Sequence, residues 1–216
     1  MEAIATDRDG VPASQAERAY LALRDMLVTL EIRPGAPVVE GELTARIGVG
    51  RTPLREAIRR LESERLVTVY PRRGTFASEI ELADLSLLTD VREELEGHAA
   101  ARAAERATAG ERSELEALVG ELDPDGPVDR LTQDALVHRA VYRAAHNPFL
   151  EETATVYHNL STRIWHLYRD RIPDLGAHIE EHRELLDAIV AGDARRARSA
   201  AVAHVRNFAR AVGRLL

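Results

Sequence analysis

The segment 48–66, GVGRTPLREAIRRLESERL, constrains the fold of this chain more than any other stretch. Two glycines, Gly48 and Gly50, indicate a tight turn, and a stretch with helical apolar spacing follows it. Three arginines recur on that stretch at four-residue spacing: Arg51, Arg55 and Arg59. A short helix, a glycine turn and a second helix that begins with basic residues are typical of a helix-turn-helix. Since the second helix of that motif enters the major groove, the segment predicts DNA binding.

Two further helices are expected before this segment. Ser14 and Glu17 are spaced as a capping box, and the apolar periodicity that follows predicts a first helix ending before Arg33. A second, short helix is expected at about 40–47, with Gly48 as its C-terminal stop. Thr52 is expected to cap the third helix, because Pro53 then occupies the first helical position, where its missing N–H costs nothing.

After Leu66 the apolar period changes from that of a helix to that of a strand. Val67 and Val69 alternate with polar or exposed-type residues, a Pro-Arg-Arg-Gly turn follows, and the chain continues as Thr75-Phe76-Ala77. Three helices and a hairpin make a winged helix-turn-helix, whose wing tip carries two arginines and Gly74. We expect residues 1–13 to be a flexible leader and residues 14–79 to form this DNA-binding domain.

The rest of the chain, residues 80–216, is expected to be an antiparallel helical bundle that binds an effector and dimerises. Breaks at glycine and proline residues predict six helices, at about 82–107, 110–120, 128–146, 148–171, 176–191 and 194–214. Only 4% of the residues are aromatic, so the core must consist of Leu, Ala, Val and Ile, which favours helices. The predicted fold class is therefore mostly α.

Composition also narrows the class of protein. The chain has no cysteine, which excludes disulfides and thiolate metal sites. It has no apolar run long enough to span a membrane and no signal pattern, so we expect a cytoplasmic protein without a membrane partner. The net charge is −7, yet residues 46–73 hold eight arginines and only three acidic residues. A basic patch on an acidic chain is what contact with phosphates requires.

All eight histidines lie in the helical half, and the spacing of some of them suggests a metal site. Asp134 and His138 share one helix face, because they are four residues apart. His182 and His204 each stand about ten residues from the Gly192-Asp193 turn, so they come level on neighbouring helices. Such a set can hold a divalent metal inside a bundle. His178 and His182 are also four residues apart, and spacing alone does not decide between the two pairings.

The chain resembles GntR-type transcription regulators of the FadR-type subfamily with an FCD ligand-binding domain. The segments that match this family are ELTARIGVGRTPLREAIRRLESERLV, RRGTF, VREELEGHAA, DALVHRAVYRAAHNPFL and EHRELLDAIVAGDARRARSAAVAH. The resemblance implies a metal (Zn, Ni or Mn) that is held by Asp134, His138, His182 and His204. His178 does not stand at a family ligand position.

The resemblance also implies contacts to an effector and to DNA. Arg92 matches a family position that points into the metal cavity and would pair with an effector carboxylate; the alternative is an ion pair with Glu96 four residues on. Asn159 and Arg163, with Tyr157 and Trp165, are expected to line the same pocket. The predicted DNA contacts are Arg51, Thr52, Arg55, Arg59, Arg73 and Gly74. Gly41 and Gly50 depart from the family, which has polar residues there.

The sequence thus predicts a DNA-binding repressor or activator. It would act as a homodimer on a palindromic, double-stranded operator, with its affinity controlled by a small organic acid at the metal site. One alternative is a regulator that senses the metal itself, or in which the metal is structural. A remote alternative is a helical metalloenzyme that activates water. For the arginines at 51–59, the alternative to DNA contact is a solvated helix face.

Overall fold

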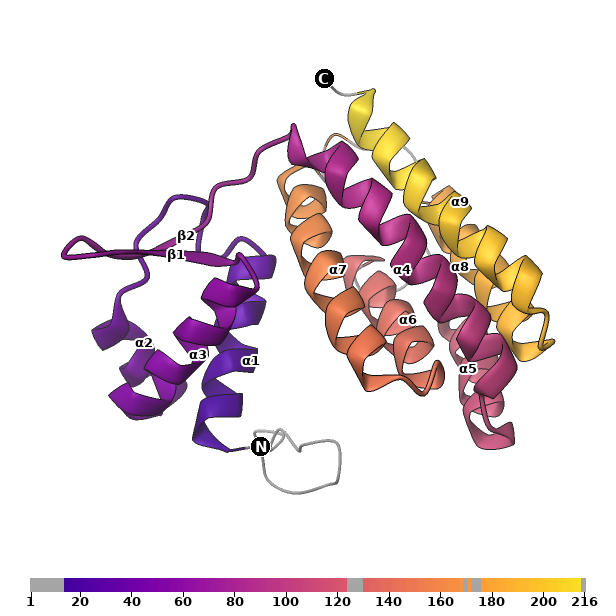
Figure 1. Cartoon of the computed structure of the whole chain (residues 1–216), viewed down its shortest axis with the longest axis horizontal. Helices are drawn as coiled ribbons and strands as arrows, with labels where there is room; N and C mark the ends of the chain where they lie inside the picture. The colour runs from indigo at the N-terminus through magenta and orange to yellow at the C-terminus, as the bar shows by residue number, and fades with distance from the viewer. Residues whose placement is uncertain (1–13, 124–129, 169–170, 172–175, 215–216) are drawn as a thin grey trace. The chain divides into compact units, whose positions relative to one another are not determined.

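A computed structural model describes residues 14–123, 130–168, 171 and 176–214 of the chain. The chain divides into two compact units, one ending at Glu81 and one beginning at Leu82, and each is described by itself (Figure 1). The expected leader 1–13 and parts of the expected breaks at 123–127 and Pro173 lie outside the described residues. No helix in the described part of the chain is long and apolar enough to cross a bilayer.

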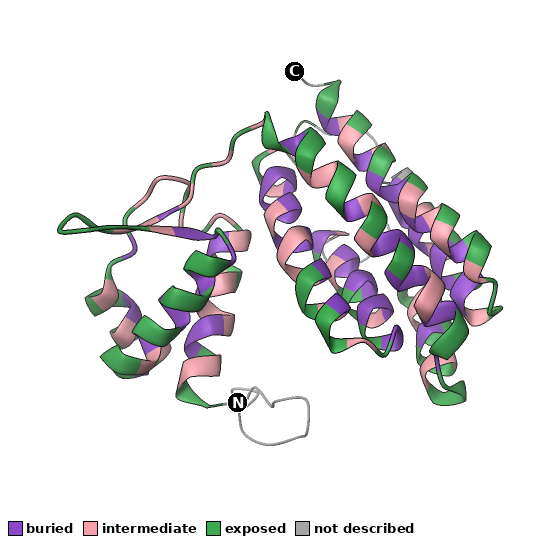
Figure 2. Cartoon of the chain, viewed as in Figure 1, coloured by how far each residue is buried: buried purple, intermediate pink, exposed green. Residues whose placement is uncertain are grey.

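The first unit contains three helices: α1 (Gln15–Val28), α2 (Glu40–Ile47) and α3 (Arg51–Ser63). Ser14 caps α1 by accepting a hydrogen bond from the Glu17 N–H. Gly48 ends α2 with φ of 72°, a left-handed conformation that glycine adopts without strain. The inward faces of the helices carry most of the buried residues (Figure 2).

The expected capping role of Thr52 is wrong. The N-cap of α3 is Gly50, which makes no side-chain cap bond, and Arg51 is already helical. Pro53 therefore occupies the third helical position instead of the first. This costs no hydrogen bond, because the first few N–H groups of any helix lack an intrahelical acceptor.

The wing consists of the antiparallel strands β1 (Val67–Tyr70) and β2 (Gly74–Ala77). The turn between them closes with a hydrogen bond from the Arg73 N–H to the Tyr70 carbonyl. Arg72 and Gly74 have φ of 65° and 103°, so the chain reverses through two left-handed residues. The loop before α2 pairs with the outer side of β2 through Pro37 and Phe76.

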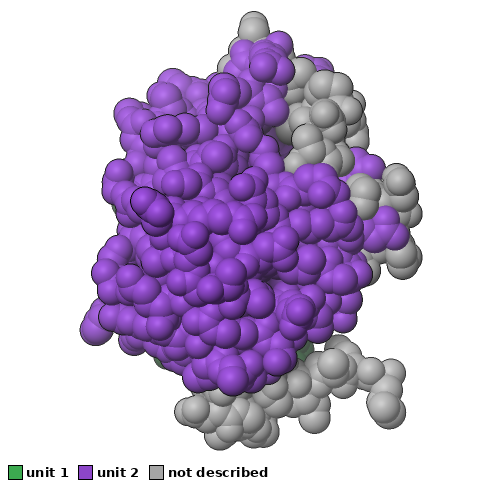
Figure 3. Space-filling view, turned by 90° about the vertical axis from the view of Figure 1, so that its right-hand side faces the viewer, with its two compact units in different colours: residues 1–81 green, residues 82–216 purple. Residues whose placement is uncertain are grey.

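The second unit contains six helices in its described part. They are α4 (Asp84–Arg106), α5 (Ala109–Glu121), α6 (Arg130–Ala144), α7 (Pro148–Tyr168), α8 (Gly176–Val190) and α9 (Ala194–Gly213). They pack around one core of Ala, Leu, Val and Ile side chains, with few aromatics. The face of this unit in Figure 3 is continuous, with only shallow hollows. The predicted fold class, a winged helix-turn-helix followed by a helical bundle, is confirmed.

Candidate functional site

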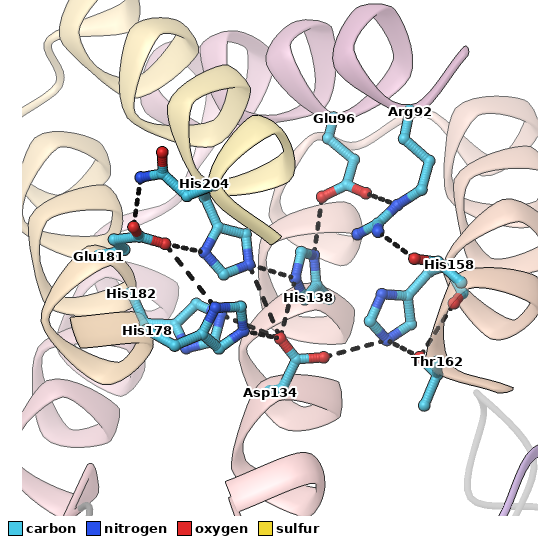
Figure 4. Close-up of polar contacts among 12 residues, drawn as sticks. Arg92, Glu96, Asp134, His138, His158, Thr162, His178, Glu181, His182 and His204 are labelled. Atoms are coloured by element: carbon cyan, nitrogen blue, oxygen red, sulfur yellow. Dashed lines mark hydrogen bonds and ion pairs between the residues drawn. The ribbon is translucent and has the colours of Figure 1, made fainter. Parts of the chain in front are cut away.

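Three helices of the second unit bring four potential metal ligands to one point. Asp134 and His138 come from α6, His182 from α8 and His204 from α9. One ligand atom from each lies within 4.8 Å of the others, and all four residues are buried (Figure 4). The Nε2 atoms of His138, His182 and His204 lie 3.4, 3.2 and 3.7 Å from Asp134 Oδ1.

The hairpin between α8 and α9 sets the level of two of these side chains. Gly192, with φ of 74°, turns the chain, and Asp193 caps α9 by accepting from the Arg196 N–H. His182 and His204 therefore face each other from adjacent helices, with ring centroids 4.4 Å apart. This agrees with the expectation from the sequence, because both histidines stand about ten residues from the Gly192-Asp193 turn.

The donor set fits a divalent metal ion. Bonds of about 2.0–2.2 Å to a metal place neighbouring ligand atoms roughly 3–3.6 Å apart, close to the separations found here. His182 is fully buried, and neither of its ring nitrogens has a hydrogen-bond partner among the described residues. Its Nε2 lies 3.2 Å from Asp134 Oδ1 without being aligned for a hydrogen bond. A buried imidazole without an aligned hydrogen bond is costly, and a metal would satisfy its ring nitrogen.

Burial and neighbouring charges set the protonation of these groups. Burial lowers the pKa of His182 to about 4, so its ring is neutral near pH 7, the form that binds metals. Burial also acts to lower the pKa of His138, but the Glu96 and Asp134 carboxylates outweigh it and raise that pKa to about 9. Burial acts to raise the pKa of Asp134, yet the surrounding imidazoles, His138 first, hold it well below its usual range.

Two further histidines surround this centre. His178 Nε2 lies 3.0 Å from Asp134 Oδ1, nearer than any of the three predicted ligands, and its ring packs on His204. His158 stacks on His138 with centroids 4.3 Å apart, and its Nε2 lies 3.6 Å from Asp134 Oδ2. Burial lowers the pKa of both imidazoles well below the usual range, so both rings are neutral.

Arg92 adjoins this centre, and both roles weighed for it are compatible with its position. Its Nε donates to Glu96 Oε1 at 2.6 Å, which is the ion pair expected from the four-residue spacing. Its Nη1 donates to Ser161 at 2.6 Å, and the residue also lines a small cavity beside Asp134 and His158. That cavity has about 10 Å³ of free space, roughly the room of one water molecule.

The other two expected effector contacts lie on α7 but outside the lining of this cavity. Asn159 is 9% exposed, and its Nδ2 has no hydrogen-bond partner among the described residues. Arg163 is 2% exposed. Trp165, by contrast, does line the cavity, with its ring edge-on to that of His178.

In the first unit, α3 presents the four predicted DNA contacts to solvent: Arg51, Thr52, Arg55 and Arg59 are all exposed. The opposite face of α3 is buried. Arg55 Nε pairs with Glu40 Oε2 of α2 at 3.0 Å, and its side chain remains 61% exposed. Arg60 has a different environment, because its Nε pairs with Glu64 and its guanidinium stacks on the buried Tyr20.

The wing carries the remaining two predicted contacts. Arg73 and Gly74 are exposed at the end of the hairpin, next to Arg72. The left-handed Gly74 presents its backbone without a side chain, which permits close approach to a phosphate or a groove wall.

Comparison with known proteins places both units. Residues 15–77 match the model of bacterial regulatory proteins of the gntR family, and residues 87–207 match the FCD domain. The chain is 35% identical over 208 residues to an uncharacterised HTH-type transcriptional regulator in an unstable DNA locus of Streptomyces ambofaciens, covering 87% of this chain and 80% of that protein. The chain belongs to the GntR family.

Solved structures agree with this assignment. The GntR-family chain superposes on Escherichia coli McbR with a TM-score of 0.82, covering 94% of this chain and 99% of that one at 25% identity. A sequence comparison with the HTH-type transcriptional regulator McbR gives 29% identity over 177 residues, 79% of this chain and 80% of McbR. The protein is accordingly a transcriptional regulator with an FCD domain.

The structure adds residues around the cluster that the sequence analysis of this GntR-family chain did not identify. The sequence predicts Glu96 only as an ion-pair partner of Arg92, yet its Oε2 lies 3.0 Å from His138 Nδ1. Glu181 Oε2 lies 3.0 Å from His204 Nδ1, and the His158 ring packs on the ring of His138. Glu181 directly precedes a predicted ligand, but that spacing carries no recognisable signal; only the packing of α4, α7 and α8 reveals these contacts.

Proposed function

We propose that this GntR-family regulator binds operator DNA with an affinity set by a small organic acid, which binds at a metal ion in the FCD domain. The observation that carries the proposal is the buried convergence of Asp134, His138, His182 and His204 within 4.8 Å. Three imidazoles and one carboxylate suit Zn, Ni or Mn and leave coordination positions open on an octahedral ion. Bound there, the metal would supply those positions to a carboxylate or hydroxyl of the effector.

Arg92 is the residue we propose for the effector's charge. Its guanidinium lines the cavity beside Asp134, and a guanidinium can bind a carboxylate through two parallel hydrogen bonds. Asn159 and Arg163 stay candidates for further contacts, the first because its buried amide nitrogen lacks a partner among the described residues. Since the cavity has about 10 Å³ free, effector binding requires that side chains or helices around it move apart.

For DNA, we propose that Arg51, Thr52, Arg55 and Arg59 of α3 enter the major groove while Arg73 and Gly74 of the wing approach the backbone or minor groove. Their common exposure supports this arrangement. GntR-family regulators bind operators typically as dimers, so a palindromic operator and a homodimer belong to the proposal. The effector would shift the population of DNA-binding arrangements, with a coupling typically of about 1–3 kcal/mol.

The small cavity favours a second candidate, a regulator that responds to the metal itself. In that case the enclosed site needs no organic ligand. An enzyme is not proposed, because the relatives are transcriptional regulators and the DNA-binding unit would have no role.

One titration separates the two candidates. Metal-stripped protein is bound to DNA of its own promoter region, and metal and then small carboxylic acids are added while operator affinity is measured by fluorescence anisotropy. The first candidate predicts a large change only when the acid is added to the metal-loaded protein. A large response to metal alone, with no response to acids, would support the second.

The DNA contacts are tested separately. Arg55→Ala should weaken operator binding by about 1–3 kcal/mol if Arg55 reads a base, and should relax specificity at one position. Arg102→Ala removes the same charge from the FCD domain, where Arg102 pairs with Glu105, and serves as the matched control. Uniform weakening on all sequences would mean that Arg55 contacts a phosphate.

A further inference from the structure

We propose that Glu96 is the positioning residue of the metal ligand His138, and that it links this ligand to Arg92. The inference rests on the metal site proposed above. Glu96 lies on α4, which contributes none of the four ligands, and it is 3% exposed. Its two carboxylate oxygens contact different partners on opposite sides (Figure 4).

The contact to His138 selects the ring nitrogen that is free to bind the metal. Glu96 Oε2 lies 3.0 Å from His138 Nδ1 and, as a carboxylate, can only accept the hydrogen bond. Nδ1 must then carry the proton, which leaves the Nε2 lone pair for the metal. His138 Nε2 is the nitrogen that lies 3.4 Å from Asp134 Oδ1 and 3.3 Å from His204 Nε2.

A second group competes for the same nitrogen. The Tyr142 hydroxyl lies 3.2 Å from His138 Nδ1. A carboxylate is the stronger acceptor because its bonds are charge-assisted, and the Glu96 contact is shorter. Glu96 therefore orients the ring, and Tyr142 supports it from the side.

The other ligands provide an internal comparison. Glu181 Oε2 lies 3.0 Å from His204 Nδ1, so His204 is held in the same tautomer by a carboxylate of α8. His182 Nδ1 has no hydrogen-bond partner among the described residues. Two of the three imidazoles thus have the outer carboxylate that commonly orients a metal-bound histidine, and the third is held by packing.

Glu96 also connects the metal ligand to the cavity. Its Oε1 accepts from Arg92 Nε at 2.6 Å, while Arg92 Nη1 reaches Ser161. A carboxylate that binds Arg92 competes with Glu96 for the guanidinium and so alters how Glu96 holds His138. Metal binding and carboxylate binding are therefore coupled through the Glu96 side chain. This coupling does not require that Arg92 contacts any of the four ligands.

The test compares Zn²⁺ and Ni²⁺ affinities of the full-length protein by competition with a chromophoric chelator. Glu96→Gln keeps the size of the side chain but can accept only one of the two hydrogen bonds, so it should weaken binding by about 10–100-fold. Arg92→Met should weaken it less, and Arg92→Met/Glu96→Gln no more than Glu96→Gln alone. Glu94 lies on α4, as Glu96 does, but it is exposed and pairs with Arg198 of α9. Glu94→Gln should therefore leave the metal affinity unchanged.

A second measurement reads the tautomer directly. In ¹⁵N spectra of the histidine side chains of Zn²⁺-loaded wild-type protein, His138 should carry its proton on Nδ1, and this signal should shift in Zn²⁺-loaded Glu96→Gln. Protonation on Nε2 in the Zn²⁺-loaded wild type overturns the proposal even if the variant does not fold. Unchanged affinity of a folded Glu96→Gln overturns this inference alone, whereas a wild-type protein that binds no metal overturns the metal site and this inference together.

Discussion

Asp134 Oδ1 lies at the centre of a group of four buried histidines in the FCD domain. The Nε2 atoms of His178, His182, His138 and His204 lie 3.0, 3.2, 3.4 and 3.7 Å from it. The buried carboxylate is stabilised by these imidazoles, which hold its pKa well below the usual range. Distance to this oxygen therefore does not by itself separate ligands from neighbours.

The proposed four-ligand site predicts different effects for the two histidines of α8. His182→Ala should reduce bound metal sharply, because it removes a proposed ligand. Among the described histidines of the cluster, only His182 lacks a hydrogen bond at both ring nitrogens, so its ring is free to bind a metal. His178→Ala should leave most metal bound, since the proposed ligand atoms that converge within 4.8 Å belong to Asp134, His138, His182 and His204. Metal per chain is measured by mass spectrometry after dialysis. Equal losses would mean that His178 is also a ligand.

A single tyrosine gives the DNA-binding unit a predictable response to alkaline pH. Burial and the Glu64 carboxylate raise the pKa of Tyr20 from 10.0 to about 12. In the unfolded chain Tyr20 ionises near 10, whereas in the folded unit it stays neutral to about 12. Its contribution to stability is therefore complete below pH 10 and is lost as the pH rises through 12.

This loss should amount to about 1.4 kcal/mol per pKa unit at most. It is measured as the pH dependence of urea unfolding, followed in the wild type and in Tyr20→Phe. The variant should lose the Glu64 hydrogen bond and with it this pH dependence. Tyr70→Phe, at an exposed wing position, is the matched control and should behave as the wild type. An alkaline response that persists in Tyr20→Phe would assign it to another group.

At the scale of elements, the contact of α4 with α9 depends on one glycine. A Cβ at Gly97 would lie 2.9 Å from Val202 Cγ2 and 3.2 Å from Arg198 Cγ. Gly97→Ala should therefore destabilise the FCD domain by about 1–2 kcal/mol, because overpacking outweighs the gain in helix propensity.

The control for this substitution is Gly120→Ala in α5. A Cβ there meets no described atom within 4 Å, so the same change should stabilise the protein by up to about 1 kcal/mol. Both are measured by thermal unfolding followed by circular dichroism. If Gly97→Ala were as stable as Gly120→Ala, α4 and α9 would not be packed as tightly as described.

The Arg112 side chain connects the ends of two helices. Its guanidinium donates to the carbonyls of Ile189 and Val190 at the end of α8 and of Ala104 near the end of α4. Carbonyls in the last turn of a helix lack intrahelical partners, so one side chain satisfies two helix ends. No sequence pattern indicates this role, because the two acceptors in α8 lie 77 and 78 residues further along the chain.

For the whole molecule, the two units should respond separately to metal. The candidate ligands all belong to the second unit, so metal binding should raise the unfolding temperature of that unit. At free metal about 100 times the dissociation constant the stabilisation is roughly 2.7 kcal/mol. Differential scanning calorimetry of stripped and loaded protein should show one shifted transition, and His182→Ala should show none. Equal shifts of both transitions would contradict a site confined to the FCD domain.

The helices and strands of this protein, and their order, follow from local sequence patterns. Apolar periods, glycine stops and the Pro-Arg-Arg-Gly turn define helices and hairpin locally, which is why the winged unit and the six following helices were predicted. The predicted N-cap of α3 was wrong. Gly50 and Thr52 are both residues that occur at N-caps, and the helix begins after Gly50.

Which side chains share a centre depends on how the helices pack. Spacing within one helix placed Asp134 and His138 on one face, and the tight hairpin brought His182 level with His204. The contribution of Glu96 depends on how α4 lies against α6, a contact between residues about 40 positions apart that no periodicity encodes. Spacing along the chain predicts which side chains share a helix face. The carboxylate that contacts the outer nitrogen of a buried histidine becomes apparent only once the helices have packed.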